Sequence, residues 1–192
     1  MEESARDWLE RSAEGFLRKV GLAEGDTVLD FGCNEGNYAA PAARIVGEAG
    51  RVYALDKNAE ALQEIAQASK QKGLHNIRCL QVPEDGDIPL PCCSVDAVLL
   101  YDVLHRGYFP EHAGRMKALS SICRVLKGSG MLSFYPTHLK KYGMTFDRAL
   151  SEIEAVCFTS REESRRRLVH DGRLTRGRVF SYRKRGTCGQ ER

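Results

Sequence analysis

Apolar and polar residues follow two alternating periods along this chain, and these periods predict an alternation of strands and helices. Short continuous apolar runs predict buried strands at about 27–31, 51–56, 77–82, 95–101 and 131–135. Apolar residues at helical spacing predict helices at about 4–20, 37–47, 60–72, 111–126 and 146–156. Two final β segments, at about 164–170 and 178–183, lie on either side of Asp171-Gly172 and predict a hairpin.

This order of elements predicts an α/β fold. We expect a three-layer αβα sandwich around a mostly parallel, seven-stranded sheet that ends in a C-terminal antiparallel β-hairpin. The length of 192 residues suits a single domain with a sizeable core. Within it we expect an N-terminal helix in 1–22, a cofactor-binding core in 23–135, and a helix followed by the hairpin in 136–192.

The segment after the first predicted strand carries the most informative chemistry. That strand closes on an acid, Asp30, and the turn Gly32–Gly36 follows before the next helix. The second predicted strand also closes on an acid, Asp56. In parallel sheets of this kind, ligands bind at the carboxyl ends of the strands, and the acid after the second strand accepts hydrogen bonds from ribose hydroxyls. The pattern therefore predicts a site for a nucleoside-bearing cofactor.

The charges in this turn indicate which cofactor binds. A dinucleotide would place its pyrophosphate against the turn and the helix that follows. Asp30 and Glu35 would repel a pyrophosphate, and the Gly-x-Gly-x-x-Gly spacing would require glycine at Asn34 and Asn37. A nicotinamide dinucleotide is therefore disfavoured. S-adenosylmethionine (SAM) carries an ammonium and a sulfonium and no phosphate, so the carboxylates favour SAM.

Four motifs in order resemble those of the class I (Rossmann-like) SAM-dependent methyltransferases, in particular the small-molecule, type 11-like enzymes. The run Val28-Leu29-Asp30-Phe31-Gly32-Cys33 resembles the family's first motif, and Gly50–Asp56 resembles its second strand. Ile88–Val98 resembles the approach to the fourth strand, and Val125–Leu132 resembles the turn into the fifth. Asn34 replaces the family's usual middle glycine, and we expect the turn to survive because Asn tolerates positive φ.

The resemblance implies a set of cofactor-binding positions: Asp30, Gly32, Cys33, Asn34, Gly36, Asp56, Lys57, Glu84 and Asp102. Asp30 would orient the ammonium, and the backbone around Gly32 and Gly36 would lie against the methionine moiety. Asp56 would hold the ribose, and Glu84 or Asp85 lies where the family often contacts the adenine amino group.

Methyl transfer from SAM needs alignment of acceptor and methyl, and sometimes removal of a proton. Related small-molecule enzymes often carry a run like Asp102-Val103-Leu104-His105 beside the transferable methyl. The candidate catalytic residues are therefore Asp102, which would polarise the acceptor, and His105, which would act as a base. The alternatives are that Asp102 caps a turn and that His105 only packs or bonds to the backbone. His138 is a further candidate base, and Tyr108 and Phe109 would line an acceptor site or the core.

The cysteines form no Cys-x-x-Cys pair, so we expect no metal site. Scattered free thiols are typical of a reducing cytoplasm, where we expect the protein to reside. The neighbouring residues Cys92 and Cys93 are expected to be reduced thiols in a surface turn, with soft-metal binding or redox sensing as alternatives.

The distribution of basic residues leaves a macromolecular acceptor as an alternative to a small molecule. Ten basic and three acidic residues lie from Arg161 to Arg185, a local charge of +7 in a chain whose net charge is +3. A basic exposed hairpin accounts for this, although such a patch also attracts anionic partners. We expect a small-molecule acceptor; the alternatives are an RNA or protein methyltransferase that uses this region, and a SAM-binding module without turnover. No apolar run reaches the ~20 residues that span a bilayer, so no membrane contact is expected, and no oligomeric state is predicted.

Overall fold

The computed structural model of the protein describes residues 3–82 and 87–186. The strands within these residues are β1 Thr27–Phe31, β2 Arg51–Asp56, β3 Ile77–Gln81, β4 Val95–Tyr101, β5 Leu126–Tyr135, β6 Phe158–His170 and β7 Arg173–Lys184. The helices are α1 Ala5–Arg11, α2 Ala13–Val20, α3 Ala39–Val46, α4 Ala59–Gln71, α5 His112–Val125 and α6 Phe146–Glu154. No helix among the described residues is long and apolar enough to cross a membrane.

The described strands form one seven-stranded sheet in the order β3-β2-β1-β4-β5-β7-β6. The first five strands pair in parallel, β7 runs antiparallel to β5, and β6 runs antiparallel to β7. The predicted α/β fold with its C-terminal antiparallel hairpin is therefore confirmed. The order reverses direction between β1 and β4, and in such sheets this reversal opens the crevice in which ligands bind.

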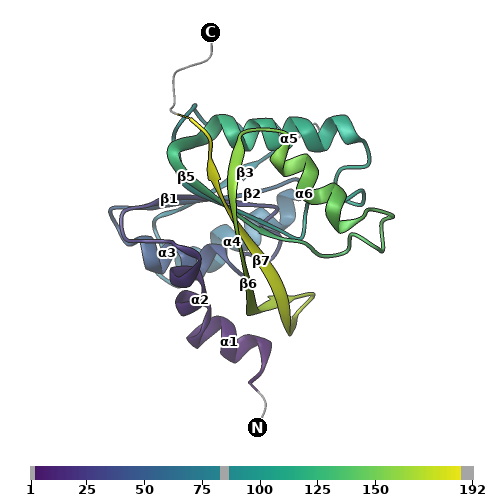
Figure 1. Cartoon of the computed structure of the whole chain (residues 1–192). Coiled ribbons are helices and arrows are strands. Elements are labelled where there is room, and N and C mark those ends of the chain that lie inside the picture. The colour runs from purple at the N-terminus through teal and green to yellow at the C-terminus, as the bar shows by residue number, and fades with distance from the viewer. Residues whose placement is uncertain (1–2, 83–86, 187–192) are drawn as a thin grey trace.

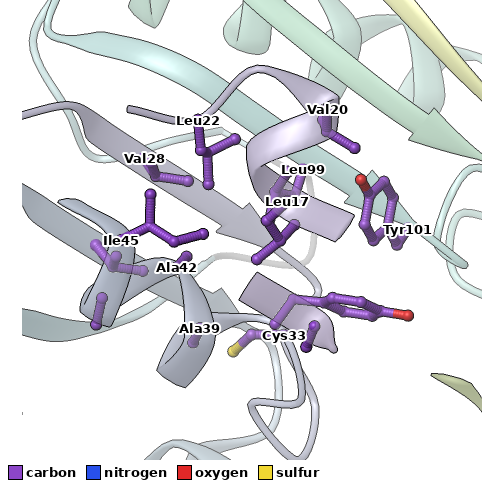
Figure 2. Close-up of a cluster of buried hydrophobic side chains, with 14 of the residues drawn as sticks. Leu17, Val20, Leu22, Val28, Cys33, Ala39, Ala42, Ile45, Leu99 and Tyr101 are labelled. Atoms are coloured by element: carbon purple, nitrogen blue, oxygen red, sulfur yellow. The ribbon is translucent and has the colours of Figure 1, made fainter. Parts of the chain in front are cut away.

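Helices cover both faces of the sheet (Figure 1), with α5 and α6 on one side and α1 to α4 on the other. On the second face Leu17 of α2 and Ile45 of α3 pack against Val28 and Leu99 of the sheet (Figure 2). The small side chains of Ala39 and Ala42 let α3 lie close to the strands. This packing fixes the carboxyl end of β1, where the turn begins.

The N-terminal helix differs from the single helix expected at 4–20. The chain forms two helices that meet at Ser12, whose φ of −114° is not helical. The Ser12 hydroxyl donates to the Glu3 carboxylate at 2.9 Å, while the Ser12 N–H still donates to the Trp8 carbonyl. The break lets Trp8 and Phe16 both reach the core, where their rings lie 5.7 Å apart.

The terminal hairpin is longer than expected, since β6 and β7 have 13 and 12 residues. Charged residues interrupt the alternation of apolar and polar residues that would predict these strands. In the structure, charged side chains on β6 and β7 pair with each other across the hairpin. Arg178 donates to both carboxylate oxygens of Glu163, at 2.7 and 2.8 Å. The same guanidinium lies 4.4 Å from the Phe146 ring, so exposed charges still pack on aromatic surface.

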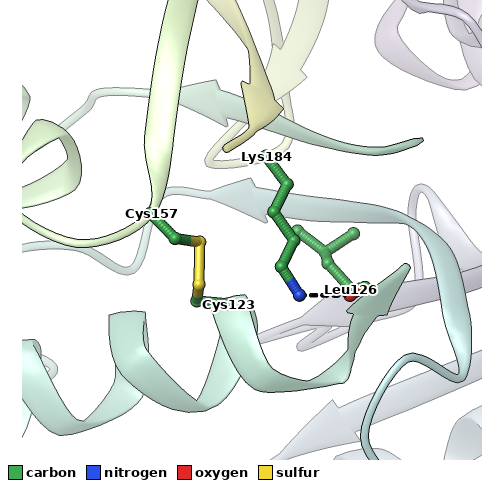
Figure 3. The surroundings of a disulfide bond; sticks show 4 residues. All are labelled: Cys123, Leu126, Cys157 and Lys184. Carbon is green, nitrogen blue, oxygen red and sulfur yellow. Dashed lines mark hydrogen bonds between the residues drawn. A yellow bond between two sulfur atoms is a disulfide. The ribbon is translucent and has the colours of Figure 1, made fainter. Parts of the chain in front are cut away.

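The prediction that the cysteines are free thiols is wrong for at least three of them. Cys123 of α5 and Cys157, just before β6, form a disulfide with a Cα–Cα distance of 6.0 Å (Figure 3). Cys93 is also disulfide-bonded, so Cys92 and Cys93 are not a pair of reduced thiols. Which cysteines form disulfides depends on which helices and strands pack together. The spacing of the cysteines along the sequence does not reveal that packing. The cytoplasmic location inferred from free thiols loses this support and stays a prediction.

Candidate functional site

A cavity of about 180 Å³ opens at the carboxyl ends of β1, β4 and β5. Its walls come from the turn after β1, the ends of β4 and β5, and the turn of the hairpin. The lining residues are Asp30, Gly32, Cys33, Asn34, Glu35, Asn37, Tyr38, Tyr101, Asp102, Tyr135, Val169, His170, Asp171 and Gly172. The cavity thus lies at the edge of the sheet where the sequence predicts the cofactor.

Asp30 is the buried acid of this cavity, with an exposed fraction of 3%. Burial, together with the nearby charge of Asp56, raises the pKa of Asp30 from 3.8 to about 7. Its Oδ2 atom has no hydrogen-bond partner among the described residues. Buried polar groups are nearly always satisfied, so an unpaired carboxylate oxygen in a cavity is suited to a cationic ligand.

The turn after β1 needs its glycine. Gly32 has a φ of +75°, and a Cβ on it would lie 2.1 Å from Cγ1 of Val103. Its N–H donates to the carbonyl of Leu55 at 2.7 Å, which ties the turn to β2. Asn34 adopts a φ of 42°, as expected of a residue that tolerates positive φ. The replacement of the family's middle glycine therefore preserves the turn.

Asp56 is 7% exposed, and its carboxylate faces the same turn. Oδ2 accepts from the Asn34 N–H at 3.0 Å and Oδ1 accepts from the Asn58 N–H at 2.9 Å. Asp56 is not among the residues that line the cavity. In this structure the residue predicted to hold ribose therefore also fixes the shape of the cofactor turn. The predicted adenine contact at Glu84 lies outside the described residues.

Lys57 and Tyr108 cover the side of the site beyond Asp56. The Lys57 ammonium donates to the Tyr108 carbonyl at 2.9 Å and lies 4.5 Å from the centre of the Tyr108 ring. The Tyr108 ring is 6.4 Å from that of Phe31, and its buried hydroxyl has no partner among the residues described. Burial, Asp56 and Cys33 raise the pKa of the Tyr108 phenol. Tyr108 thus occupies space next to the ends of β1 and β2.

Asp102 lies at the cavity wall, and His105 does not. Burial, followed by the charge of Asp171, raises the pKa of Asp102 to about 7. Nδ1 of His105 accepts from the N–H groups of Gly107 and Tyr108, so its Nε2 donates to the Asp102 carbonyl at 3.0 Å. The His105 ring stacks on Tyr142 at 4.6 Å, and burial lowers its pKa. These bonds give His105 the geometry of a positioning residue, and its role as a base stays a prediction.

The structure adds two cavity residues that the sequence did not single out, His170 and Asp171. Nδ1 of His170 lies 2.8 Å from Oδ2 of Asp102, and burial lowers the His170 pKa. His138, a predicted candidate, places its Nε2 3.5 Å from the same oxygen. The Asp171-Gly172 turn signal located the hairpin, but only the pairing of β7 with β5 brings its turn to the cavity.

Comparison with known proteins agrees with this geometry. Residues 22–165 match the family described as a methyltransferase domain. The probable cobalt-precorrin-6B C(15)-methyltransferase (decarboxylating) of Saccharolobus solfataricus is 37% identical over 147 residues, which are 76% of this chain and 68% of that protein. The ubiquinone/menaquinone biosynthesis C-methyltransferase UbiE of Francisella tularensis subsp. novicida is 32% identical over 117 residues, covering 60% of this chain and 44% of that protein.

A solved structure shows the same fold. The SAM-dependent methyltransferase from Aquifex aeolicus superposes with a TM-score of 0.69 at 24% identity, over 95% of this chain and 93% of that one. The family match spans most of the chain and includes the turn, the two strand-end acids and the residues after β4. The chain therefore belongs to the SAM-dependent methyltransferases, and S-adenosylmethionine is its methyl donor.

Proposed function

We propose that the protein transfers a methyl group from SAM to a small molecule that enters the cavity beside Asp102. The observation that carries this proposal is the buried carboxylate of Asp30 in the wall of that cavity, whose Oδ2 has no hydrogen-bond partner among the described residues. Asp30 holds the SAM ammonium, and the turn Gly32–Gly36 lies along the methionine chain. Asp56 bonds the ribose through lone pairs that its backbone donors leave free. Asp102 faces the methyl and the acceptor.

Cofactor binding in this proposal requires a movement. Ligand pockets usually enclose about 300–1,000 Å³, more than the 180 Å³ open here. In sheets of this kind a nucleoside binds beyond the carboxyl ends of the strands, and Tyr108 lies beyond the ends of β1 and β2. The Tyr108 hydroxyl forms no hydrogen bond with a described residue, so displacing the ring breaks none that the described structure shows. We therefore expect Tyr108, with the Lys57 ammonium bound to its carbonyl, to make room for the adenosine.

The acceptor side is enclosed and aromatic. Tyr38, Tyr101 and Tyr135 line the cavity, with ring centroids 4.9 Å apart for Tyr38 and Tyr101 and 6.2 Å apart for Tyr101 and Tyr135. Aromatic side chains supply large apolar contact area to a flat ligand. The two relatives named above are a probable cobalt-precorrin methyltransferase and a ubiquinone/menaquinone biosynthesis methyltransferase. The three tyrosine side chains therefore favour a small-molecule acceptor with a flat ring system.

A nucleic acid is the second candidate acceptor. The basic residues of the hairpin are the observation that favours it. A surface hollow lined by Arg167, Arg173 and Arg176 includes Gly172, which also lines the cavity. A basic surface therefore leads to the cavity mouth, and cationic side chains supply most non-specific affinity for phosphate backbones. Arg167 is already paired with Glu3 at 3.1 Å, which reduces the charge available to a polyanion.

One assay separates these alternatives. The protein is incubated with methyl-labelled SAM and either a small-molecule extract or total RNA, at low and high salt. We expect label in a small molecule, with transfer unchanged in the variant Arg173→Gln/Arg176→Gln. Label in RNA that falls with salt and with this double variant would replace the proposal by the nucleic-acid function. Tight SAM binding with no label in any fraction would indicate a binding module without turnover.

A further inference from the structure

Four ionisable side chains converge at the mouth of the cavity from separate parts of the chain. Asp102 follows β4, His138 follows β5, His170 ends β6 and Asp171 begins the hairpin turn. One potential ligand atom from each of the four lies within 4.8 Å of the other three. We call these four residues the mouth cluster. His138 and His170 are 21% and 18% exposed, so the imidazoles are shielded but accessible.

Two of the separations in the mouth cluster match those of atoms that share a metal ion, and a third is shorter, at a hydrogen-bond distance. Nε2 of His138 lies 3.5 Å from Oδ2 of Asp102 and 3.5 Å from Oδ2 of Asp171, and Nδ1 of His170 lies 2.8 Å from Oδ2 of Asp102. Tetrahedral ligands at metal distances of about 2.0–2.2 Å are roughly 3.3–3.6 Å apart. Small side-chain adjustments therefore bring all four atoms into one coordination sphere.

Two further observations set the mouth cluster apart from ordinary surface ion pairs. Oδ1 of Asp102 is buried and has no hydrogen-bond partner among the described residues. Asp102, His138 and Asp171 also adopt φ values of 64°, 54° and 47°. Such values are uncommon outside glycine, and residues held in them gather at functional sites. Three residues with positive φ thus contribute side chains to one cluster.

The geometry points to a binding site for one divalent first-row transition ion of the Zn²⁺ class, held by Asp102, His138, His170 and Asp171. Two imidazoles and two carboxylates suit such an ion, whereas Mg²⁺ and Ca²⁺ prefer oxygen ligands alone. A divalent cation also neutralises the two carboxylates. The expectation of no metal site rested on cysteine spacing, which gives no information about ligands gathered from separate loops.

The position of this site beside the cavity suits an ion that would interact with the acceptor. Asp102 and His170 line the cavity, so an ion between them faces the space that we assign to the acceptor. A metal ion held there would bind an acceptor hydroxyl oxygen and lower its pKa, so that the hydroxyl would lose its proton to solvent more readily before methyl transfer. Metal binding itself does not rest on the proposed function, because it needs neither SAM nor an acceptor.

The test uses full-length, untagged protein that has been stripped of metal with a chelator and dialysed. Co²⁺, a visible probe for Zn²⁺ sites, is titrated without SAM, and Zn²⁺ binding is measured by calorimetry. We expect one ion per chain and a visible Co²⁺ spectrum, with at least tenfold weaker binding in His138→Ala and in His170→Ala. His75→Ala, which removes an exposed histidine before β3, is the matched control and is expected to bind like the wild type.

Thermal unfolding and circular dichroism of each variant show whether it is folded, and Asp102→Asn provides a near-isosteric fourth variant. Binding that is absent in the wild type, or unchanged in all three cluster variants, would overturn the site. A parallel titration of metal-free protein with SAM separates the two proposals. SAM binding without metal binding refutes the metal site alone, and the opposite result refutes the proposed SAM placement alone.

Discussion

Replacing Asp30 with asparagine is expected to weaken SAM binding by about 100-fold while making the folded protein more stable at pH 8. The loss of affinity follows because Asp30→Asn removes the buried negative charge that faces the cofactor's ammonium. Truncating one partner of a buried charge pair typically costs 2–5 kcal/mol, and about 2.7 kcal/mol corresponds to a factor of 100. Calorimetric titration with SAM measures the affinity, with the exposed Asp147→Asn as the control.

The gain in stability follows from the sign of the pKa shift. The pKa of Asp30 is raised from 3.8 to about 7 in the folded state, chiefly by burial. The folded state therefore binds this proton more tightly than the unfolded state, and stability falls as pH rises from about 4 to about 7. A neutral asparagine removes this penalty, which is of the order of 2–4 kcal/mol at pH 8. A variant that is both less stable and weaker in binding would show that Asp30 has a structural role instead.

The same shift predicts a pH dependence for the wild type. SAM needs the ionised carboxylate, so its affinity should fall by about tenfold for each pH unit below about 7, until the loss reaches the roughly 100-fold expected of Asp30→Asn. The Asp30→Asn variant should show a much flatter profile over the same range. Parallel profiles in the two proteins would assign the pH dependence to another group.

Replacing Glu152 with alanine is expected to destabilise the protein by about 3–5 kcal/mol, because it leaves a buried guanidinium without its counter-ion. Arg115 is 1% exposed, and it donates to the two oxygens of Glu152 at 2.7 and 2.9 Å. Arg148 and His112 contact the same carboxylate at 3.1 and 2.9 Å. The melting temperature should fall by about 2–4 °C per kcal/mol.

Glu154→Ala is the matched control, because Glu154 pairs with Arg161 on the exposed surface and contributes under about 1 kcal/mol. Urea unfolding measures both free energies. The double variant Arg115→Met/Glu152→Leu should recover much of the loss, since paired apolar residues often replace a buried ion pair without penalty. A small effect of Glu152→Ala, equal to that of Glu154→Ala, would contradict this account.

The Arg115 network also bears on the site. Another nitrogen of the Arg115 guanidinium donates to the Phe109 carbonyl at 3.0 Å. It therefore anchors the segment that carries Tyr108. The ion pair between α5 and α6 thus supports the segment that we propose is displaced by SAM.

The positions of the two strand-end acids and of the turn between them could be predicted from the sequence because local rules determine them. An apolar run fixes where a strand ends, and parallel strands bring their carboxyl ends to one edge, so Asp30 and Asp56 were expected to lie close together. The charge pattern then selected SAM over a dinucleotide. The positive φ of Asn34 followed from the same local argument.

The acceptor end could not be predicted, because tertiary packing determines it. The pairing of β7 with β5 brings His170 and Asp171 to Asp102, and no sequence spacing encodes that distance. The disulfide between Cys123 and Cys157 joins residues 34 positions apart and depends on the packing of α5 beside β6. The backbone bonds on both nitrogens of His105 agree with one alternative that the sequence left open, but the sequence could not decide between that alternative and a role as base.

The most direct test of the central claim is a crystal structure with S-adenosylhomocysteine, which keeps the amino group and adenosine of SAM. We expect the amino group within hydrogen-bond distance of Oδ2 of Asp30. We expect the ribose beside Asp56, and the Tyr108 ring displaced from the ends of β1 and β2. A ligand bound elsewhere on the protein, or bound here with its amino group away from Asp30, would contradict the account.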